Sequence, residues 1–212
     1  MCRILHVARW SKRCTVLGPG IRAVIWVQGC PFRCQGCVAP ETLPFAGGEH
    51  LEVERLANDI LALDYINGVT FSGGEPMSQP AALSVLVDCI RRERDLSFMS
   101  YTGFTLKHLI NGGTVAQKRL LSLLDILVDG PYVRKRHTDL KWRGSDNQRV
   151  IFLSDRHQDC KNTMNSRGTN IEFEIDHNTL HWMGIPPVGF REKFEERMQS
   201  WGLDLTHSEE KS

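Results

Sequence analysis

Three cysteines crowd into one short segment of the chain. Cys30, Cys34 and Cys37 follow one another at the spacing C-x₃-C-x₂-C. Thiolates are soft ligands that suit iron–sulfur clusters, zinc or Cu(I), and a structural zinc site normally closes with four ligands. Because three ligands are grouped here, we predict metal binding and favour an iron–sulfur cluster over zinc. A redox dithiol, a structural zinc site and ordinary buried thiols are the alternatives, and the spacing selects no fourth ligand among His50, Cys89 and Cys160.

A second polar segment, Ser72-Gly73-Gly74-Glu75-Pro76, directly follows a predicted strand. Two glycines let the backbone approach a ligand closely and adopt positive φ angles. Backbone carbonyls and the Glu75 carboxylate are acceptors that an ammonium group needs. The segment therefore predicts a ligand-binding turn. Its alternative is a tight turn from strand to helix, with Glu75 in the first helical turn.

Two further polar side chains end apolar strands. Asp129 follows the run Ile126-Leu127-Val128, where an unpaired carboxylate is costly. It is therefore predicted either to meet a ligand or to cap a turn. Thr102 ends another predicted strand and is a candidate for the same site.

The other polar motifs are less specific. The segment 142–148 is dense in hydrogen-bonding groups, and we predict that it lines the site or a partner channel; the alternative is a solvated loop with Trp142 packed on the core. Arg22 is expected to pair with a carboxylate beside the site or to lie exposed at the surface.

Alternating strands and helices must position these residues. Apolar runs and helical spacing of apolar residues predict both kinds of element. We predict strands over 24–27, 68–72, 96–101, 126–128 and 148–153, helices over 51–63, 80–94, 106–110, 116–124 and 190–201, and a hairpin of strands 171–175 and 179–183 that turns at His177-Asn178.

The order of the elements predicts an α/β fold. Cys30, Gly73, Thr102 and Asp129 all lie just after strand ends, and parallel strands bring such positions to one edge. A full eight-unit barrel needs about 250 residues, so 212 residues favour a partial barrel or an open sheet. We expect a core over residues 1–153 and a hairpin, helix and polar tail over 154–212 that pack on it.

Composition excludes several classes of protein. The 26 basic and 25 acidic residues leave a formal charge of +1, which argues against nucleic acid as a partner. The sequence contains no apolar run of about 18 residues, so no membrane is expected. Seven cysteines, three of them clustered, do not form a disulfide framework and predict a reducing, cytoplasmic compartment. Cys2, Cys14, Cys89 and Cys160 are expected to be apolar fillers or free thiols.

The cysteine motif resembles the signature of radical S-adenosylmethionine (SAM) enzymes. The preceding Gly18-Pro19-Gly20-Ile21-Arg22 and the following Phe71-Ser72-Gly73-Gly74-Glu75-Pro76 resemble the activating-enzyme branch of that superfamily. The similarity extends from about Gly18 to about Leu153. It is carried further by the segments 101–104, 127–130 and 142–148.

The resemblance implies a partial (β/α) barrel that holds a 4Fe–4S cluster on Cys30, Cys34 and Cys37, with one iron open to SAM. It implies that Ser72, Gly73, Gly74 and Glu75 hold the SAM amino group, that Asp129 lies near the SAM ribose or methionine end, and that Thr102 lies on the same edge. No catalytic side chain beyond the cofactor ligands is implied. A lysine typical of relatives just after the aspartate is replaced here by Pro131-Tyr132, and an aromatic residue near the adenine by Gly36 and Val38.

The activity implied by the resemblance is reductive cleavage of SAM to a 5′-deoxyadenosyl radical. That radical would take hydrogen from a glycine on a large partner similar to anaerobic ribonucleotide reductase, with a flavodoxin- or ferredoxin-like electron donor. A peptide, another glycyl-radical enzyme or a small metabolite is the alternative hydrogen donor. A zinc-stabilised binding module without catalysis is the alternative from another class.

Overall fold

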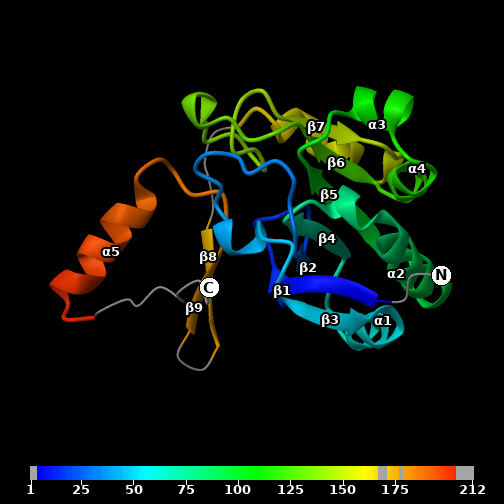
Figure 1. Cartoon of the computed structure of the whole chain (residues 1–212), viewed down its shortest axis with the longest axis horizontal. Helices are drawn as coiled ribbons and strands as arrows, with labels where there is room; N and C mark the ends of the chain where they lie inside the picture. Colours follow the sequence, from blue (N-terminus) through cyan, green and yellow to red (C-terminus); the bar gives the residue numbers. More distant parts are fainter. Residues whose placement is uncertain (1–3, 167–170, 177–178, 204–212) are drawn as a thin grey trace.

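Seven strands form a single sheet in the computed structural model, which describes residues 4–166, 171–176 and 179–203 (Figure 1). Their order across the sheet is β3-β1-β2-β4-β5-β6-β7. The strands are β1 (Ile4–Cys14), β2 (Arg22–Val27), β3 (Glu49–Glu52), β4 (Gly68–Gly73), β5 (Ser97–Thr102), β6 (Ile126–Asp129) and β7 (Arg149–Phe152).

The four central strands, β2, β4, β5 and β6, run parallel, and antiparallel strands flank them on both sides. Within the described residues, β3 and β7 end the sheet, so it is open. The α/β architecture is confirmed, whereas its description as a partial barrel stays a prediction. Parallel pairing brings the carboxyl ends of the central strands to one edge.

Helices cover one face of this sheet and bury its main apolar cluster. These helices are α1 (Val53–Leu61), α2 (Pro80–Glu93), α3 (Leu106–Gly112) and α4 (Val115–Ser122), whereas α5 (Phe190–Ser200) lies away from this face. Short 3-10 segments are η1 (Pro40–Thr42), η2 (Pro76–Ser78), η3 (Arg134–Arg136) and η4 (Asp155–Thr163). In α2, Leu83, Leu86 and Ile90 are buried against strand residues such as Phe71 and Phe98. The burial of each such side chain contributes about 1.5–3 kcal/mol to the free energy of unfolding. No helix of the described residues is long and apolar enough to cross a membrane.

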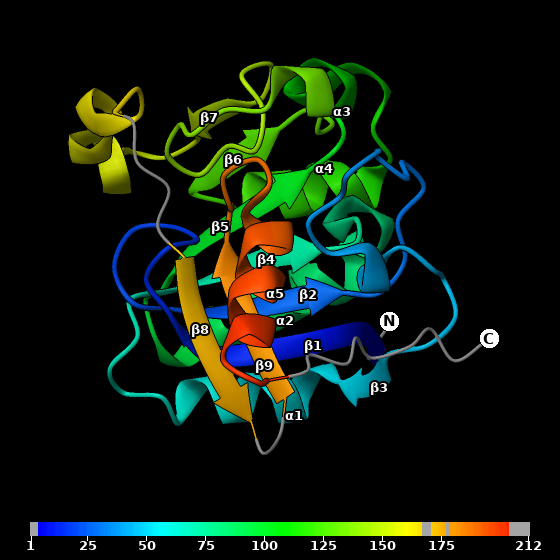
Figure 2. The same ribbon diagram turned by 90° about the vertical axis from the view of Figure 1, so that its left-hand side faces the viewer.

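The opposite face of the sheet is covered by the C-terminal hairpin, β8 (Ile171–Asp176) and β9 (Thr179–Gly184) (Figure 2). Met183 packs with Cys14, Leu17, Val24 and Trp26 in a second apolar cluster. Helix α5 stacks on the hairpin through aromatic rings, with Phe190 5.1 Å from Trp182 between ring centroids. The predicted hairpin and last helix are confirmed; the predicted turn at 177–178 and the polar tail lie outside the described residues.

The structure corrects the prediction at the start of the chain. The prediction has no strand over residues 4–14, and it places Leu51 and Glu52 in a helix over 51–63. Both residues belong instead to β3, where Leu51 pairs with Leu5 and Glu52 with Ile4. The apolar spacing fitted a helix, but pairing with the long strand β1 decides the backbone conformation of residues 49–52.

Candidate functional site

The predicted site residues meet at the carboxyl edge of the parallel strands. Val27, at the end of β2, pairs with Gly73 at the end of β4, and Thr102 at the end of β5 pairs with Asp129 at the end of β6. Ser72 lies one residue before Gly73 and pairs with Trp26. The loops that follow these strands therefore begin next to one another.

The cysteine loop begins directly after β2 and is anchored by its backbone. The Gly29 N–H donates to the Thr42 carbonyl at 2.8 Å, and the Cys30 N–H donates to the Leu43 carbonyl at 3.0 Å. Cys30 is buried, Cys34 and Cys37 are half-buried, and all three are free thiols. The fold thus presents three unpaired sulfur atoms from one short loop at the strand ends.

The surroundings of these thiols suit a positively charged ligand. Burial raises the pKa of Cys30 and of Cys37; the charge of Glu75 raises the pKa of Cys30 further, and the charge of the Cys34 thiolate raises both. Iron or zinc offsets both effects, because metal binding favours the deprotonated sulfur.

The Gly73-Gly74 turn touches the start of the cysteine loop. The Gly74 N–H donates to the Val27 carbonyl and the Glu75 N–H donates to the Gly29 carbonyl, both at 2.8 Å. A Cβ atom on Gly74 would lie 2.3 Å from the Gly29 carbonyl oxygen. Gly73 has a φ angle of +88°. This close contact requires glycine and joins the two motifs that the sequence places far apart.

Glu75 is buried and connects the end of β4 to the end of β5. Its Oε1 atom accepts hydrogen bonds from the Met77 N–H and the Thr102 hydroxyl, each at 2.8 Å, and its Oε2 atom accepts one from the Gly103 N–H at 2.7 Å. Burial raises the pKa of Glu75 to about 7, against the opposing effect of these hydrogen bonds. Glu75 also caps η2, so the tight turn that the sequence left as an alternative is present.

Asp129 has a partner that the sequence did not indicate. Its carboxylate receives two hydrogen bonds from the Arg149 guanidinium, one of them at 2.9 Å between Nε and Oδ1, and a third from the Leu106 N–H at 2.6 Å. Asp129 is buried, but the Arg149 side chain is 58% exposed. Arg149 lies opposite Asp129 across the antiparallel pair β6–β7, and neither its spacing nor its neighbours indicate that register.

The segment 142–148 braces the neighbouring loop. Gln148 donates to the Gly130 carbonyl at 3.0 Å, and Asn147 donates to the Pro131 carbonyl at 2.8 Å. Trp142 is buried in a third apolar cluster, on the face of β5 and β6 opposite the helices, together with Met99, Ile126, Val128 and Met164. The packing of Trp142 follows the alternative interpretation, and the hydrogen bonds hold the backbone that follows Asp129.

Arg22 does not belong to this edge. It is fully buried at the start of β2 and donates to Thr70, Ser97 and backbone carbonyls, and among the described residues no carboxylate accepts a hydrogen bond from it. Both predictions for Arg22, a rim ion pair and surface exposure, are therefore wrong. Desolvation lowers its pKa to about 10, and the ring of oxygen acceptors replaces an ion pair.

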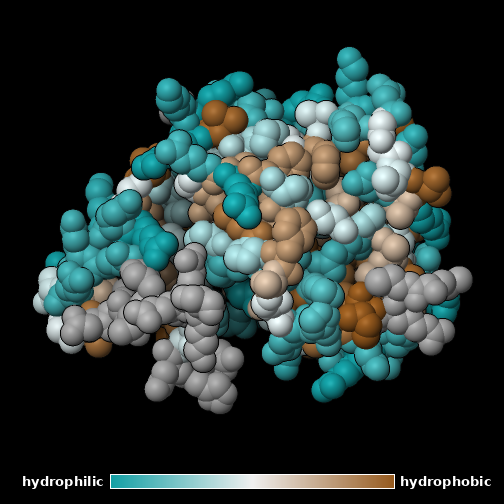
Figure 3. All heavy atoms as spheres, viewed as in Figure 1, coloured by the Kyte–Doolittle hydropathy of each residue, from teal (hydrophilic) through white to brown (hydrophobic). Residues whose placement is uncertain are grey.

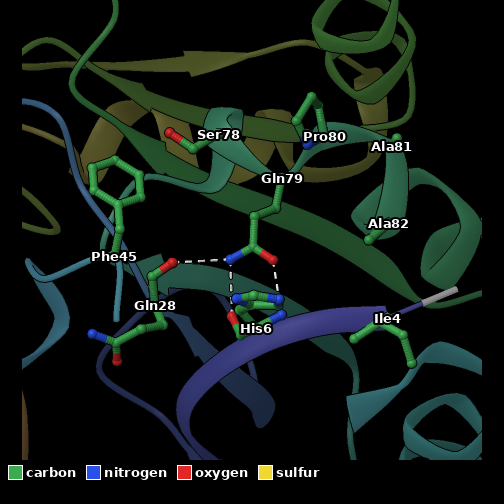
Figure 4. Close-up of a pocket in the computed structure, with 9 residues that line it drawn as sticks. All are labelled: Ile4, His6, Gln28, Phe45, Ser78, Gln79, Pro80, Ala81 and Ala82. Atoms are coloured by element: carbon green, nitrogen blue, oxygen red, sulfur yellow. Dashed lines mark hydrogen bonds between the residues drawn. The ribbon is translucent and has the colours of Figure 1, made fainter. Parts of the chain in front are cut away.

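Gln79 is hydrogen-bonded to Gln28, which directly precedes the cysteine loop (Figure 4). Its Nε2 atom donates to the carbonyls of His6 and Gln28, at 2.9 and 3.0 Å, and its Oε1 atom accepts from the His6 N–H. These bonds tie the start of α2 to β1 and to the residue before Gly29. Sequence analysis missed Gln79, because an amide before a helix has many other uses.

Apolar side chains lie exposed around the cysteine loop. Val38 is 49% exposed and Phe45 is 62% exposed. Apolar atoms also gather in the middle of the face shown in Figure 3, whereas the region of α5 is mostly hydrophilic there. Phe32 contacts Phe104 edge to face, with ring centroids 4.9 Å apart, so the loop also packs on the β5–α3 connection.

Comparison with known proteins gives one matching family model, two relatives in sequence and one solved structure. A family model described as "4Fe-4S single cluster domain" matches residues 16–151. An anaerobic ribonucleoside-triphosphate reductase-activating protein of Vibrio cholerae is 34% identical over 144 residues, which cover 63% of this chain and 88% of that protein. A pyruvate formate-lyase-activating enzyme of Clostridium pasteurianum is 46% identical over 71 residues, covering 31% of this chain and 30% of that enzyme. Among solved structures, QueE from Escherichia coli matches with a TM-score of 0.38 and 20% identity, over 48% of this chain and 53% of that one.

Proposed function

Since the chain belongs to the family of proteins with a 4Fe-4S single cluster domain, and within it to the radical SAM activating enzymes, we propose that it generates a glycyl radical on a partner protein. The cofactors of this enzyme are a 4Fe–4S cluster and SAM. When reduced and held by Cys30, Cys34 and Cys37, such a cluster would supply the electron for cleavage of SAM to methionine and a 5′-deoxyadenosyl radical, and that radical would abstract hydrogen from the substrate. The observation that carries the proposal is the contact between the cysteine loop and the Gly73-Gly74 turn.

Cys30, Cys34 and Cys37 are the proposed ligands of three irons, which leaves the fourth iron for SAM. The burial of Cys30 and its backbone bond to Leu43 support this assignment, because they fix one end of the loop. Cys34 and Cys37 are half-buried, so their thiols are accessible to the other irons of such a cluster.

The turn after β4 is proposed to hold the SAM amino group. Ser72, Gly73 and Gly74 offer backbone carbonyls at the edge, and Glu75 offers its Oε2 atom, which accepts one hydrogen bond where Oε1 accepts two. Thr102 positions Glu75 through its hydroxyl. The amino group would then contact a carboxylate that the protein already orients.

Asp129 and Arg149 are proposed to serve the other polar end of SAM. Arg149 has a 58% exposed side chain at the carboxyl edge of the sheet, beside an aspartate that Pro131 and Tyr132, rather than a lysine, follow in the chain. Its guanidinium is a suitable partner for the SAM carboxylate. Asp129 orients that guanidinium, and through it the ribose and methionine end of SAM.

The partner is proposed to resemble anaerobic ribonucleotide reductase. This choice rests on the reductase-activating relatives, which match more of the chain than the pyruvate formate-lyase-activating enzyme does. The test is electron paramagnetic resonance of the cluster-loaded chain incubated with SAM, a reductant and each candidate partner. We expect a glycyl signal on a reductase-like partner. A signal on another glycyl-radical enzyme, a peptide or a metabolite alone would overturn the partner and keep the chemistry.

The electron donor is proposed to be a flavodoxin- or ferredoxin-like protein. The location is the cytoplasm, as the clustered free thiols suggest. Residues 1–153 form the catalytic core, a partial (β/α) barrel, and residues 154–212 pack on it. A zinc-stabilised module without catalysis is disfavoured, because the family that matches residues 16–151 is a 4Fe-4S family.

A further inference from the structure

A second group of metal-ligating side chains lies outside the site described above. His157, Asp159 and Cys160 each direct one ligand atom into a common space, and these atoms all lie within 4.8 Å of one another. The three residues belong to η4, which follows β7. The backbone of His157 departs from the helical conformation, with φ −126° and ψ 32°, so η4 is kinked at this residue.

The location of this group separates it from the cysteine loop. The last residue of β7, Phe152, pairs with Ile126, which is the first residue of β6. Segment η4 therefore begins at the amino ends of the parallel strands, whereas the cysteine loop begins at their carboxyl ends. Cys160 packs beside Met99 and Trp142 on the face opposite the helices.

The hydrogen bonds of the group leave it able to accept a cation. The Nε2 atom of His157 is enclosed and has no hydrogen-bond partner among the described residues. A ring nitrogen that is enclosed without a partner is unfavourable, so a ligand for this imidazole is stabilising. Asp159 and Cys160 are adjacent in the chain, and their ligand atoms lie within 4.8 Å of each other, so an oxygen and a sulfur ligand lie side by side.

The donor set selects the class of cation. One thiolate, one imidazole and one carboxylate suit Zn²⁺, whereas Ca²⁺ and Mg²⁺ take oxygen ligands. Three protein ligands leave one position of a tetrahedral zinc ion open. Asp159 and Cys160 also line a cavity of about 410 Å³, whose other walls include Gly18, Trp142 and Ile185, and this cavity has room for water or a small ligand beside the group.

We propose that His157, Asp159 and Cys160 bind one Zn²⁺ ion at the amino edge of the sheet, separate from the cluster. When Zn²⁺ binds, the Cys160 thiol releases its proton to solvent, and the resulting thiolate becomes a ligand of the ion. The ion fixes the kinked segment η4 against the third apolar cluster, on the face of β5 and β6 opposite the helices. This site does not depend on the proposed function, because it shares no residue with the cysteine loop.

The test counts metals on the full-length chain after anaerobic cluster reconstitution, so that Cys30, Cys34 and Cys37 are occupied by iron. The chain is equilibrated with a slight excess of Zn²⁺, passed through a desalting column and analysed for iron and zinc. We expect about one zinc per chain, at least about tenfold weaker zinc binding in His157→Ala and Cys160→Ser, and unchanged iron. Cys89→Ser, in α2, is the matched control and should keep both metals.

A second readout guards against variants that fold poorly. Co²⁺ replaces Zn²⁺ in the Cys30→Ser/Cys34→Ser/Cys37→Ser variant, where Cys160 is the thiolate of the proposed site, and the near-ultraviolet thiolate-to-cobalt band is recorded. We expect this band, and we expect it to disappear when Cys160→Ser is added. Zinc absent from the wild type, zinc equal in wild type and Cys160→Ser, or a cobalt band that survives Cys160→Ser overturns the proposal.

Discussion

The carboxylate of Glu75 lies buried where β4 and β5 end, and it holds the two strand ends together. Three donors from Met77, Thr102 and Gly103 converge on it. The sequence indicated Glu75 as a ligand-binding residue, and the contacts show a structural use of the same atoms. Both uses require a carboxylate, and its protonation then affects the fold as well as ligand binding.

Glu75 makes stability depend on pH in a defined direction. Burial raises its pKa to about 7 from an ordinary value of 4.5, so the folded protein keeps a proton that the unfolded chain has lost. The contribution of Glu75 to the free energy of unfolding therefore falls as pH rises from about 4.5 to about 7, and it is constant above that range. Urea unfolding between pH 5 and pH 8 should show wild type losing stability relative to Glu75→Gln.

The matched control for this measurement is Glu93→Gln, because Glu93 is exposed at the end of α2. Its stability difference from wild type should not change with pH over the same range. A Glu75→Gln difference that also stays constant would show that Glu75 is ionised throughout and contradict the raised pKa.

The Asp129–Arg149 pair predicts a linked effect on stability and SAM binding. Replacing Arg149 by Met leaves the buried Asp129 with the Leu106 N–H as its remaining partner. We expect Arg149→Met to cost about 1–3 kcal/mol of stability and to raise the KM for SAM about tenfold. Arg119→Met, which removes an exposed pair with Asp88, should cost less than about 1 kcal/mol and leave the KM unchanged. A normal KM in Arg149→Met would remove Arg149 from the proposed SAM site.

The candidate site residues could be predicted from the sequence where all the residues of a motif lie in one short segment. The cysteine spacing and the Gly73-Gly74 turn are local, so both could be read directly. The partners Arg149 and Gln79 come from other strands and helices, and their contacts depend on register and on packing. Arg22 was placed wrongly because its burial among Thr70, Ser97 and backbone carbonyls has no local sequence signal.

At the scale of elements, the contact between the end of β4 and the cysteine loop requires that residue 74 is a glycine, without a side chain. A Cβ atom on Gly74 would meet the Gly29 carbonyl at 2.3 Å, which is backbone and cannot move aside. We expect Gly74→Ala to lower the melting temperature by several degrees, corresponding to about 1–3 kcal/mol, and to reduce the iron bound after reconstitution.

Gly112→Ala provides the comparison for Gly74→Ala. A Cβ atom there lies 3.7 Å or more from its neighbours, at the end of α3, where alanine favours the helix. This variant should match or exceed the stability of wild type and keep its iron. Normal iron binding in Gly74→Ala would mean that the contact with Gly29 does not position the cysteine loop.

Parallel strands and their covering helices were predicted well from the sequence. The strands β4, β5 and β6 are mostly buried and carry apolar residues such as Phe71, Phe98 and Leu127, and α2 has clear helical spacing, so local pattern and packing agree. The antiparallel edge of β1 and β3 was not predicted. Strand β1 alternates only partly between buried and exposed residues, and β3 is short and polar, so pairing rather than composition specifies them.

At the scale of the whole molecule, the C-terminal hairpin completes the face of the sheet opposite the helices. Met183 is 4% exposed and fills a cluster with Cys14, Leu17, Val24 and Trp26. We expect Met183→Ala to cost about 2–5 kcal/mol of stability, measured by urea unfolding, with cluster iron unchanged at low temperature. Met198→Ala, on α5, is the control and should cost little, because Met198 lies outside the buried core.

The overall plan followed from the order of the elements, but the placement of the C-terminal part did not. The sequence indicated a hairpin, a helix and a parallel α/β core. Which face the hairpin covers depends on contacts such as Arg9 with the Trp182 carbonyl at 3.2 Å, and on the Thr15–Glu172 hydrogen bonds. Such contacts join residues more than 150 positions apart, and no local pattern specifies them.

The most direct test of the central proposal is formation of 5′-deoxyadenosine by the anaerobically reconstituted chain with dithionite and SAM. Wild type and Cys89→Ala should form it, and Cys34→Ala should form none and bind little iron. Equal 5′-deoxyadenosine from Cys34→Ala and wild type, or none from a wild type that carries its full iron, would contradict the assignment of the cysteine loop to SAM cleavage.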